Sequence, residues 1–298
     1  MGHIATLYPA ISQRRLPLSR DQLMLLLAAV NLLFLGLDTY LAHLVSGTIV
    51  AREYIPIYFG TIAGMILLVA GLIALRNRRL AVILSSFVFF SSVIVGFTGA
   101  YFHILRASLP AAPLGSRLSI ELLIWAPPVI APLTFALVGV WGMSAALVEE
   151  PAGSGVLRVG WGRRIYLPYS KTRAYLMMVS LGILVTLISS ALDHSRDGFQ
   201  NPWVWIPLAT GVFGTVVPAA LAAIRKPTRM DLAVYIAAML LLIITGIVGA
   251  VLHIQIDLTS QNVFVIERFI RGAPSLAPML FANMGIFGLL VLVSPNEQ

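Results

Sequence analysis

Long runs of apolar residues, separated by short polar stretches, make up most of the chain. Eight runs can be counted, at about residues 22–45, 56–75, 80–105, 119–147, 174–194, 203–224, 231–256 and 273–293. Each is near or above the roughly 20 residues that an α-helix needs to cross the hydrocarbon layer of a bilayer. The runs are continuously apolar, without the alternation of a barrel strand, so helices must satisfy their backbone groups. The pattern predicts an all-α integral membrane protein with eight transmembrane helices.

The composition agrees with this prediction. Hydrophobic residues make up 59% of the chain and charged residues 11%, far below the roughly 25% charge of soluble domains. The chain has no cysteine, which excludes disulfides, thiolate metal sites and iron–sulfur clusters. Any metal must therefore be held by imidazole, carboxylate or carbonyl groups.

The basic residues predict the orientation in the membrane. With the N-terminus inside, 14 of the 20 Lys and Arg residues fall in cytoplasmic segments and 6 on the outer side. Cytoplasmic loops are the ones enriched in Lys and Arg. We therefore expect both termini to be cytoplasmic, in a bacterial-type inner membrane. The formal charge of +8 is explained by these short loops, so nucleic acid is not expected as a partner.

The two halves of the chain carry the same pattern of Gly, Ala, Pro, Asp, Glu and His residues. The matching stretches are 96–103 with 246–253, 121–142 with 267–288, 37–38 with 192–193, and 55–60 with 206–211. Four helices per half give both halves the same orientation, so the repeats are related by an axis along the membrane normal. We predict a first repeat over 1–148, a cytoplasmic linker over 149–173 and a second repeat over 174–298.

Ionisable side chains in this topology gather near the outer ends of the helices. They are Asp38, His43, His103 and Glu121 in the first repeat, and Asp193, His194, His253 and Glu267 in the second. Such residues are costly in spanning segments and usually have a function there. Imidazole and carboxylate together are ligands for iron, copper or zinc, and helical bundles build such sites from inward-facing side chains. The sequence therefore predicts a transition-metal site, either shared between the repeats or present once in each.

A metal at this place would suit a membrane-bound, metal-dependent oxidoreductase or redox subunit. Its substrate would be lipid-soluble, such as a quinone-like molecule or a hydrocarbon, and the metal would activate oxygen or water or exchange electrons. Membrane lipid, and possible further subunits of a membrane complex, are the expected partners.

Haem is the alternative cofactor. His43 and His103 are 60 residues apart and His194 and His253 are 59 residues apart, so each pair could face across its own bundle and hold a b-type haem through two imidazoles. The layout is similar to that of the heme A synthases, which also have eight helices in two halves with paired histidines. The similarity is one of layout alone, because their histidines lie on even-numbered helices and their signature loop is missing here.

Three further interpretations are open. The ionisable groups could form a proton or metal pathway in a transporter or accessory subunit, although they lie at one face and the opposite half of each helix is apolar. The chain could be a structural subunit. Each residue taken alone could also be an ordinary polar group at the membrane interface. Gly96 and Gly246 favour close helix packing, and Pro128 and Pro274 should kink their helices and free backbone carbonyls.

Overall fold

The computed structural model describes residues 18–45, 47, 49–159, 163–259, 265, 267–268 and 272–293. Within this part, six helices are long and apolar enough to cross a membrane. They are α3 (Arg20–Val45), α4 (Tyr54–Ala74), α5 (Arg78–Ala107), α8 (Lys171–Ser195), α9 (Trp205–Ala223) and α10 (Arg229–Thr259). The protein is thus a helical membrane protein. Arg14, Arg15 and Arg271 of the orientation argument lie outside the described residues.

The outward faces of the long helices are apolar. Leu72 on α4 is 69% exposed and Phe87 on α5 is 71% exposed. A soluble helix would place polar side chains at such positions. Side chains of this kind on the surface indicate that the outward faces contact lipid.

Two apolar segments are only partly helical. The predicted span over 119–147 consists of α6 (Ile120–Trp125), a non-helical stretch over 126–132, and α7 (Leu133–Ala146). Proline lacks the backbone N–H of a helix interior and disfavours helix in the residue before it, and this stretch contains Pro127, Pro128 and Pro132. The kink expected at Pro128 is therefore a complete break between two helices.

The last segment behaves in the same way. The predicted span over 273–293 becomes helical only at α12 (Met279–Val291), after a turn that contains Pro274 and Pro278. At 1.5 Å per residue, α7 and α12 are about 21 Å and 20 Å long, shorter than the roughly 30 Å hydrocarbon layer. Irregular backbone at membrane depth is tolerated only where protein or a cavity surrounds it.

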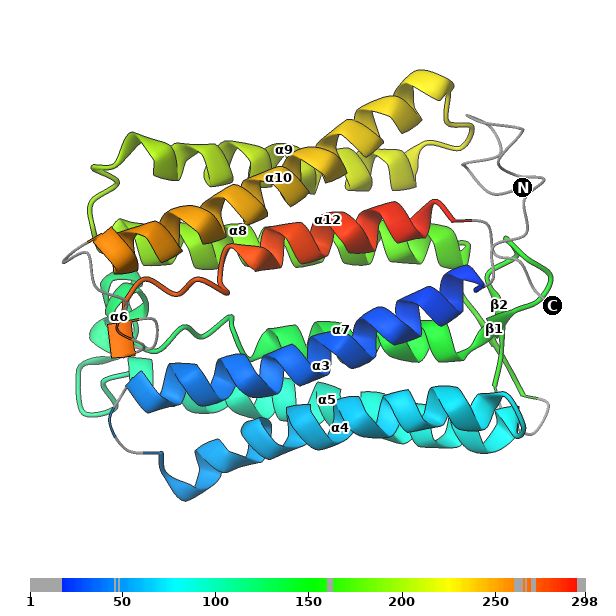
Figure 1. Ribbon diagram of the computed structural model, residues 1–298, viewed down its shortest axis with the longest axis horizontal. Coiled ribbons are helices and arrows are strands. Elements are labelled where there is room, and N and C mark those ends of the chain that lie inside the picture. Colours follow the sequence, from blue (N-terminus) through cyan, green and yellow to red (C-terminus); the bar gives the residue numbers. More distant parts are fainter. Residues whose placement is uncertain are drawn as a thin grey trace.

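The helices form two rings of four. In one ring α3, α4, α5 and α7 pack in that order, and in the other α8, α9, α10 and α12 do so. Consequently α3 and α5 lie diagonally opposite each other, as do α8 and α10. The two rings meet through α3, α7, α8 and α12, which form the centre of the molecule (Figure 1).

Equivalent positions of the two halves make equivalent close contacts. A Cβ atom at Gly96 would lie 2.5 Å from the backbone nitrogen of Ala136, and one at Gly246 would lie 2.5 Å from that of Ala282. Only glycine permits helices to approach this closely. The packing interpretation of these glycines is thereby supported.

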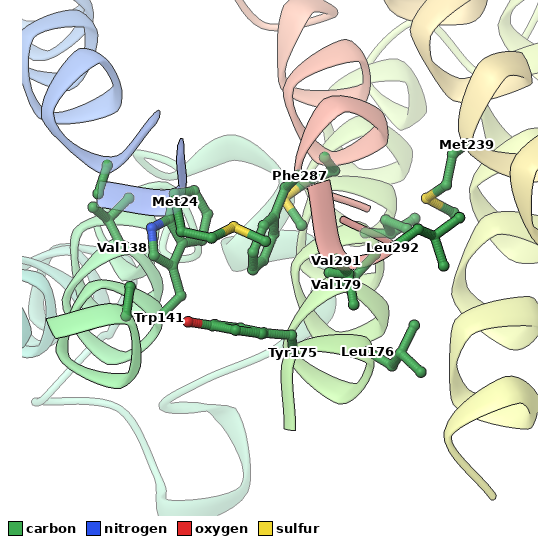
Figure 2. Packing of buried hydrophobic residues seen from close by; sticks show 14 of the residues in the cluster. Met24, Val138, Trp141, Tyr175, Leu176, Val179, Met239, Phe287, Val291 and Leu292 are labelled. Atoms are coloured by element: carbon green, nitrogen blue, oxygen red, sulfur yellow. The ribbon is translucent and has the colours of Figure 1, made fainter. Parts of the chain in front are cut away.

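Aromatic side chains fill the centre where the inner helices meet (Figure 2). The ring centroids of Trp141 on α7 and Phe287 on α12 are 4.3 Å apart, and Tyr175 on α8 lies 6.2 Å from Phe287. Met24 on α3 packs in the same cluster. All four side chains are buried, so the two four-helix rings meet in a hydrophobic core.

A polar pair also crosses this centre. The Asn31 side chain on α3 donates to Asn283 on α12 at 3.0 Å, and Asn283 donates back to Asn31 at 2.6 Å. Both amides line a small pocket that is also lined by Thr134 and Thr186. The pair therefore links α3 of one ring to α12 of the other.

Replacing Asn283 with leucine is expected to destabilise the protein by about 1 kcal/mol, because hydrogen bonds between membrane helices contribute on this scale and the side-chain oxygen of Asn31 would lose its donor. Thermal unfolding in detergent measures the change. The double variant Asn31→Leu/Asn283→Leu should recover part of the loss, since no amide is then left unpaired. Losses that simply add would contradict a direct interaction.

The segment between the rings forms a small antiparallel sheet at one end of the bundle. Its strands are β1 (Val148–Glu149), β2 (Val156–Arg158) and β3 (Arg164–Tyr166), paired in that order. The buried carboxylate of Glu149 accepts from the backbone N–H of Gly155 at 2.8 Å and of Lys171 at 2.9 Å. Gly155 has a φ of +76°, which favours glycine.

Beside the sheet, an ionic cluster joins the start of α3 to the start of α8. The Lys171 ammonium lies 2.5 Å from the Asp21 carboxylate and 2.6 Å from the carbonyl of Leu147. Arg20 donates to the Thr172 hydroxyl at 2.7 Å. Lys171 and Arg20 are 0% and 1% exposed. We call these residues, with the Tyr175 hydroxyl that donates to Asp21 at 3.2 Å, the Asp21 cluster.

Candidate functional site

Four of the histidines lie at the end of the bundle opposite the sheet. They lie near the C-terminal ends of α3, α5, α8 and α10, which all run in the same direction (Figure 1). Each is half-buried. A single structural layer therefore contains the residues His43, His103, His194 and His253.

The histidines are arranged as two pairs. The ring centroids of His43 and His103 are 6.3 Å apart, with an angle of 61° between the ring planes. The centroids of His194 and His253 are 6.4 Å apart, with an angle of 90°. Each pair bridges two diagonally opposite helices, so each pair spans the interior of its own ring at the end of the bundle.

The second member of each pair is oriented by a proline carbonyl. Nδ1 of His103 lies 2.8 Å from the oxygen of Pro128, and Nδ1 of His253 lies 3.0 Å from the oxygen of Pro274. A carbonyl oxygen can only accept, so Nδ1 carries the proton and the lone pair is on Nε2. Metal-binding histidines are commonly oriented by such a bond from their other nitrogen.

The proline spacing makes these carbonyls available. Pro132 follows Pro128 by four residues and Pro278 follows Pro274 by four. In a regular helix the N–H of residue i+4 donates a hydrogen bond to the carbonyl of residue i, but proline has no backbone N–H. The Pro128 oxygen does accept from the N–H of Ala131 at 3.3 Å, which leaves its second lone pair for the histidine. The sequence predicted freed carbonyls; their histidine partners are a finding of the structure.

The first members of the pairs have different surroundings. Nδ1 of His43 lies 2.8 Å from the carbonyl of Thr39 in its own helix, which again leaves the lone pair on Nε2. His194 follows Asp193, whose carboxylate lies 3.8 Å from the guanidinium of Arg196. The two pairs thus share their geometry but not all of their contacts.

The predicted carboxylate ligands do not form a metal-type cluster with the histidines among the described residues. Asp38 and Asp193 are half-buried on their helices, while Glu121 on α6 and Glu267 are exposed. Among the described residues, no three His, Asp or Glu side chains lie in an arrangement that could hold a metal ion. The structure thus brings the histidines together in twos, and carboxylate ligation stays a prediction.

Arg196 connects the two rings at this layer. Its Nε donates to the carbonyl of Ile124 at 2.7 Å and its Nη2 to that of Ala126 at 3.2 Å. Ile124 lies in the last turn of α6 and Ala126 directly follows that helix, two residues before Pro128. Arg196 is one of the six basic residues expected on the outer side of the membrane, and no local sequence pattern predicts its contact with residues some 70 positions away.

Asp257 is a second residue that the sequence analysis did not single out. It lies one helical turn after His253 on α10 and is 5% exposed. Its Oδ1 accepts from the backbone N–H of Ala273 at 2.9 Å, next to Pro274. Its Oδ2 is buried without a hydrogen-bond partner in the described part of the chain. Asp257 follows His253 by four residues, which places both on the same face of α10. This spacing is the sequence signal that could have identified Asp257.

Comparison with known proteins adds no relative to this description. No protein-family model, no curated protein and no solved structure matches the chain.

Proposed function

We propose that this protein carries redox cofactors on its two histidine pairs, near the outer face of a bacterial-type inner membrane. In this proposal the repeats over 1–148 and 174–298 each cross the membrane four times, with both termini and the sheet in the cytoplasm. The matching glycine contacts and the matching histidine–proline bonds support the duplication. The excess of Lys and Arg at the sheet end supports the orientation.

Haem is the cofactor that the geometry favours. Metal–imidazole bonds are about 2 Å long, so two imidazoles on opposite sides of one iron have ring centroids roughly 6 Å apart. The two pairs have centroid separations of 6.3 Å and 6.4 Å. This twofold coincidence is the observation that carries the proposal, and it would give one b-type haem with two axial histidines in each ring.

The surroundings of the histidines suit such a group. Each pair bridges the interior of a four-helix ring, the place where helical bundles hold cofactors. Backbone carbonyls fix Nδ1 of His43, His103 and His253, so the ring orientations are set before a cofactor binds. Half-burial would limit the access of water and lower the local dielectric constant, both of which tune a reduction potential.

A pair of haems in this layer would supply one-electron transfer. The chain's own part would be to bind them, orient them and keep them within reach of the bilayer. A quinone-like or other lipid-soluble donor or acceptor can approach through the apolar outward faces of the helices. The function proposed is therefore that of a membrane-bound redox protein or redox subunit.

A non-haem metal site is the second candidate. Asp193 adjoins His194 at the end of α8, and both side chains are half-buried. A carboxylate beside an imidazole is a common ligand combination for iron, copper or zinc. The recurrence of Asp38 as Asp193 in the sequence supports the same candidate.

An absorbance spectrum and metal analysis of protein purified from membranes test the proposal. We expect an intense Soret band and about two iron atoms per chain, one for each bis-histidine site. Bound metal without a Soret band would favour the second candidate. A folded protein that contains neither haem nor metal after expression with both supplied would contradict both.

A further inference from the structure

We propose that the two histidine pairs are positioned by different residues, Arg196 for the first and Asp257 for the second. The first site is defined as His43 with His103, and the second site as His194 with His253. This inference rests on the proposed cofactor function. It assigns to each site a positioning residue that does not itself bind the cofactor.

Arg196 acts on the first site although it lies on α8, beside the second. Its guanidinium donates to the carbonyls of Ile124 and Ala126. These residues directly precede the proline segment whose Pro128 carbonyl orients His103 at 2.8 Å. The non-helical stretch 126–132 has no helical ladder to hold it in place, so the two bonds from Arg196 constrain the position of the Pro128 carbonyl.

Arginine suits this task because its planar guanidinium presents several donors in a fixed geometry. The carboxylate of Asp193, 3.8 Å from Nη2, helps to hold the guanidinium in place. An axial ligand of the first site is thus positioned by a residue of the other ring.

Asp257 plays the corresponding part at the second site from within its own ring. Its Oδ1 accepts from the N–H of Ala273, the residue before the proline whose carbonyl orients His253 at 3.0 Å. The carboxylate is 5% exposed. A buried hydrogen bond to a carboxylate is stronger than one between neutral groups, so this contact can hold the turn 272–278 against α10.

Neither Arg196 nor Asp257 has a counterpart at the matching position of the first half. In the repeat alignment that pairs Asp38 with Asp193, Leu41 stands where the second half has Arg196. In the alignment that pairs His103 with His253, Ala107 stands where the second half has Asp257. The sites therefore share the histidine–proline bond and differ in what holds the proline segment, so they should respond to different substitutions.

Single-site backgrounds separate the two effects. The variant His253→Ala leaves only the first site complete, and His43→Ala leaves only the second. In the His253→Ala background, Arg196→Lys should speed the loss of haem to a haem-scavenging protein by about 10-fold, the lower range for residues that orient a metal ligand. Lysine keeps the charge and loses the paired donors. Asp257→Ala should leave this rate unchanged.

In the His43→Ala background the pattern should reverse. Asp257→Ala should speed haem loss by about 10-fold and Arg196→Lys should have little effect. Asp257→Asn retains an acceptor oxygen for Ala273 and should restore a near-normal rate, which a general packing defect would not do. Arg158→Lys, in an exposed ion pair on the sheet at the other end of the bundle, is the matched control.

If a single-site background fails to retain haem, the two midpoint potentials of the otherwise unaltered protein replace the rates as the readout. Arg196→Lys should then shift one potential and Asp257→Ala the other. A protein with no Soret band would overturn the assignment of haem to the two histidine pairs and this inference with it. A normal Soret band with both rates or both potentials unaltered, or with both substitutions acting on the same site, would overturn this inference alone.

Discussion

Replacing His103 with alanine is expected to reduce the haem content of the purified protein to about half, because a bis-histidine haem loses one of its two axial bonds. His253→Ala should remove the other half. The haem-to-protein ratio after purification measures both. Among the described residues, each histidine faces one other histidine, with centroids of the two imidazoles 6.3 Å or 6.4 Å apart. Removing one imidazole therefore leaves its site with a single histidine.

The pairing itself predicts which double variants add. His43→Ala/His103→Ala should lose no more haem than either single variant, because both changes destroy the same site. His103→Ala/His253→Ala should lose all of it, because the changes destroy separate sites. Such non-additivity within a pair and additivity between pairs is the signature of two independent units.

The fifth histidine supplies the control. His3→Ala, outside the described residues, should leave the haem content unchanged. Full haem content in both His103→Ala and His194→Ala would show that these rings are not axial ligands. If Glu121→Gln or Asp193→Asn halved the haem content while the histidine variants kept it, the carboxylates would be the ligands instead.

Replacing Asp21 with asparagine is expected to destabilise the protein by about 3 kcal/mol, the lower end of the loss on removing one partner from a buried ion pair, because the Asp21 side chain is itself 27% exposed. Lys171 and Arg20 would then be left as buried cations with less compensating charge. The ammonium of Lys171 is 0% exposed and lies 2.5 Å from Asp21. Asparagine keeps the shape of the side chain, so the change isolates the charge.

Thermal or denaturant-induced unfolding in detergent measures this effect. The exposed ion pair between Arg158 and Glu150, with side chains 60% and 50% exposed, is the control, and Arg158→Gln should change stability little because water screens such pairs. The loss should be largest for the docking of α3 against α8, whose starts the Asp21 cluster joins. Equal stability of Asp21→Asn and the unaltered protein would show that the cluster does not hold these helices together.

Much of the helical layout could be predicted because it depends on local properties. A run of about 20 apolar residues must form a helix in a bilayer wherever it lies in the fold, and six of the expected spans match long helices within a few residues. The grouping of the histidines at one end follows from their places near the helix ends and from helix direction, which are also local.

The breaks in the other two segments were harder to predict. Apolar content is the same for a helix and for the non-helical stretch 126–132, so the length of the run hides the break. Pro127, Pro128 and Pro132 pointed to a kink, but prolines occur in continuous membrane helices as well. Only the packing of α7 against α5, with Ala136 against Gly96, shows where the helix begins.

The carboxylates illustrate a different limit. Recurrence in the sequence places Asp38 and Asp193, or Glu121 and Glu267, at the same depth, but depth does not determine the direction in which a side chain points. Adjacent residues on a helix differ by about 100° in direction, so a shared layer is compatible with separate surroundings. The contacts of Arg196 and Asp257 with distant backbone were beyond any pattern of spacing.

By itself the chain's order of residues determined a helical membrane protein, the places of its long helices and the end of the bundle to which the imidazoles belong, because hydrophobic length and helix direction act locally. The tertiary structure alone decided that these imidazoles meet in twos across diagonal helices, that proline carbonyls hold two of them, and that one ring supports the other through Arg196. Those outcomes depend on how helices turn and pack, and packing is a property of the whole molecule.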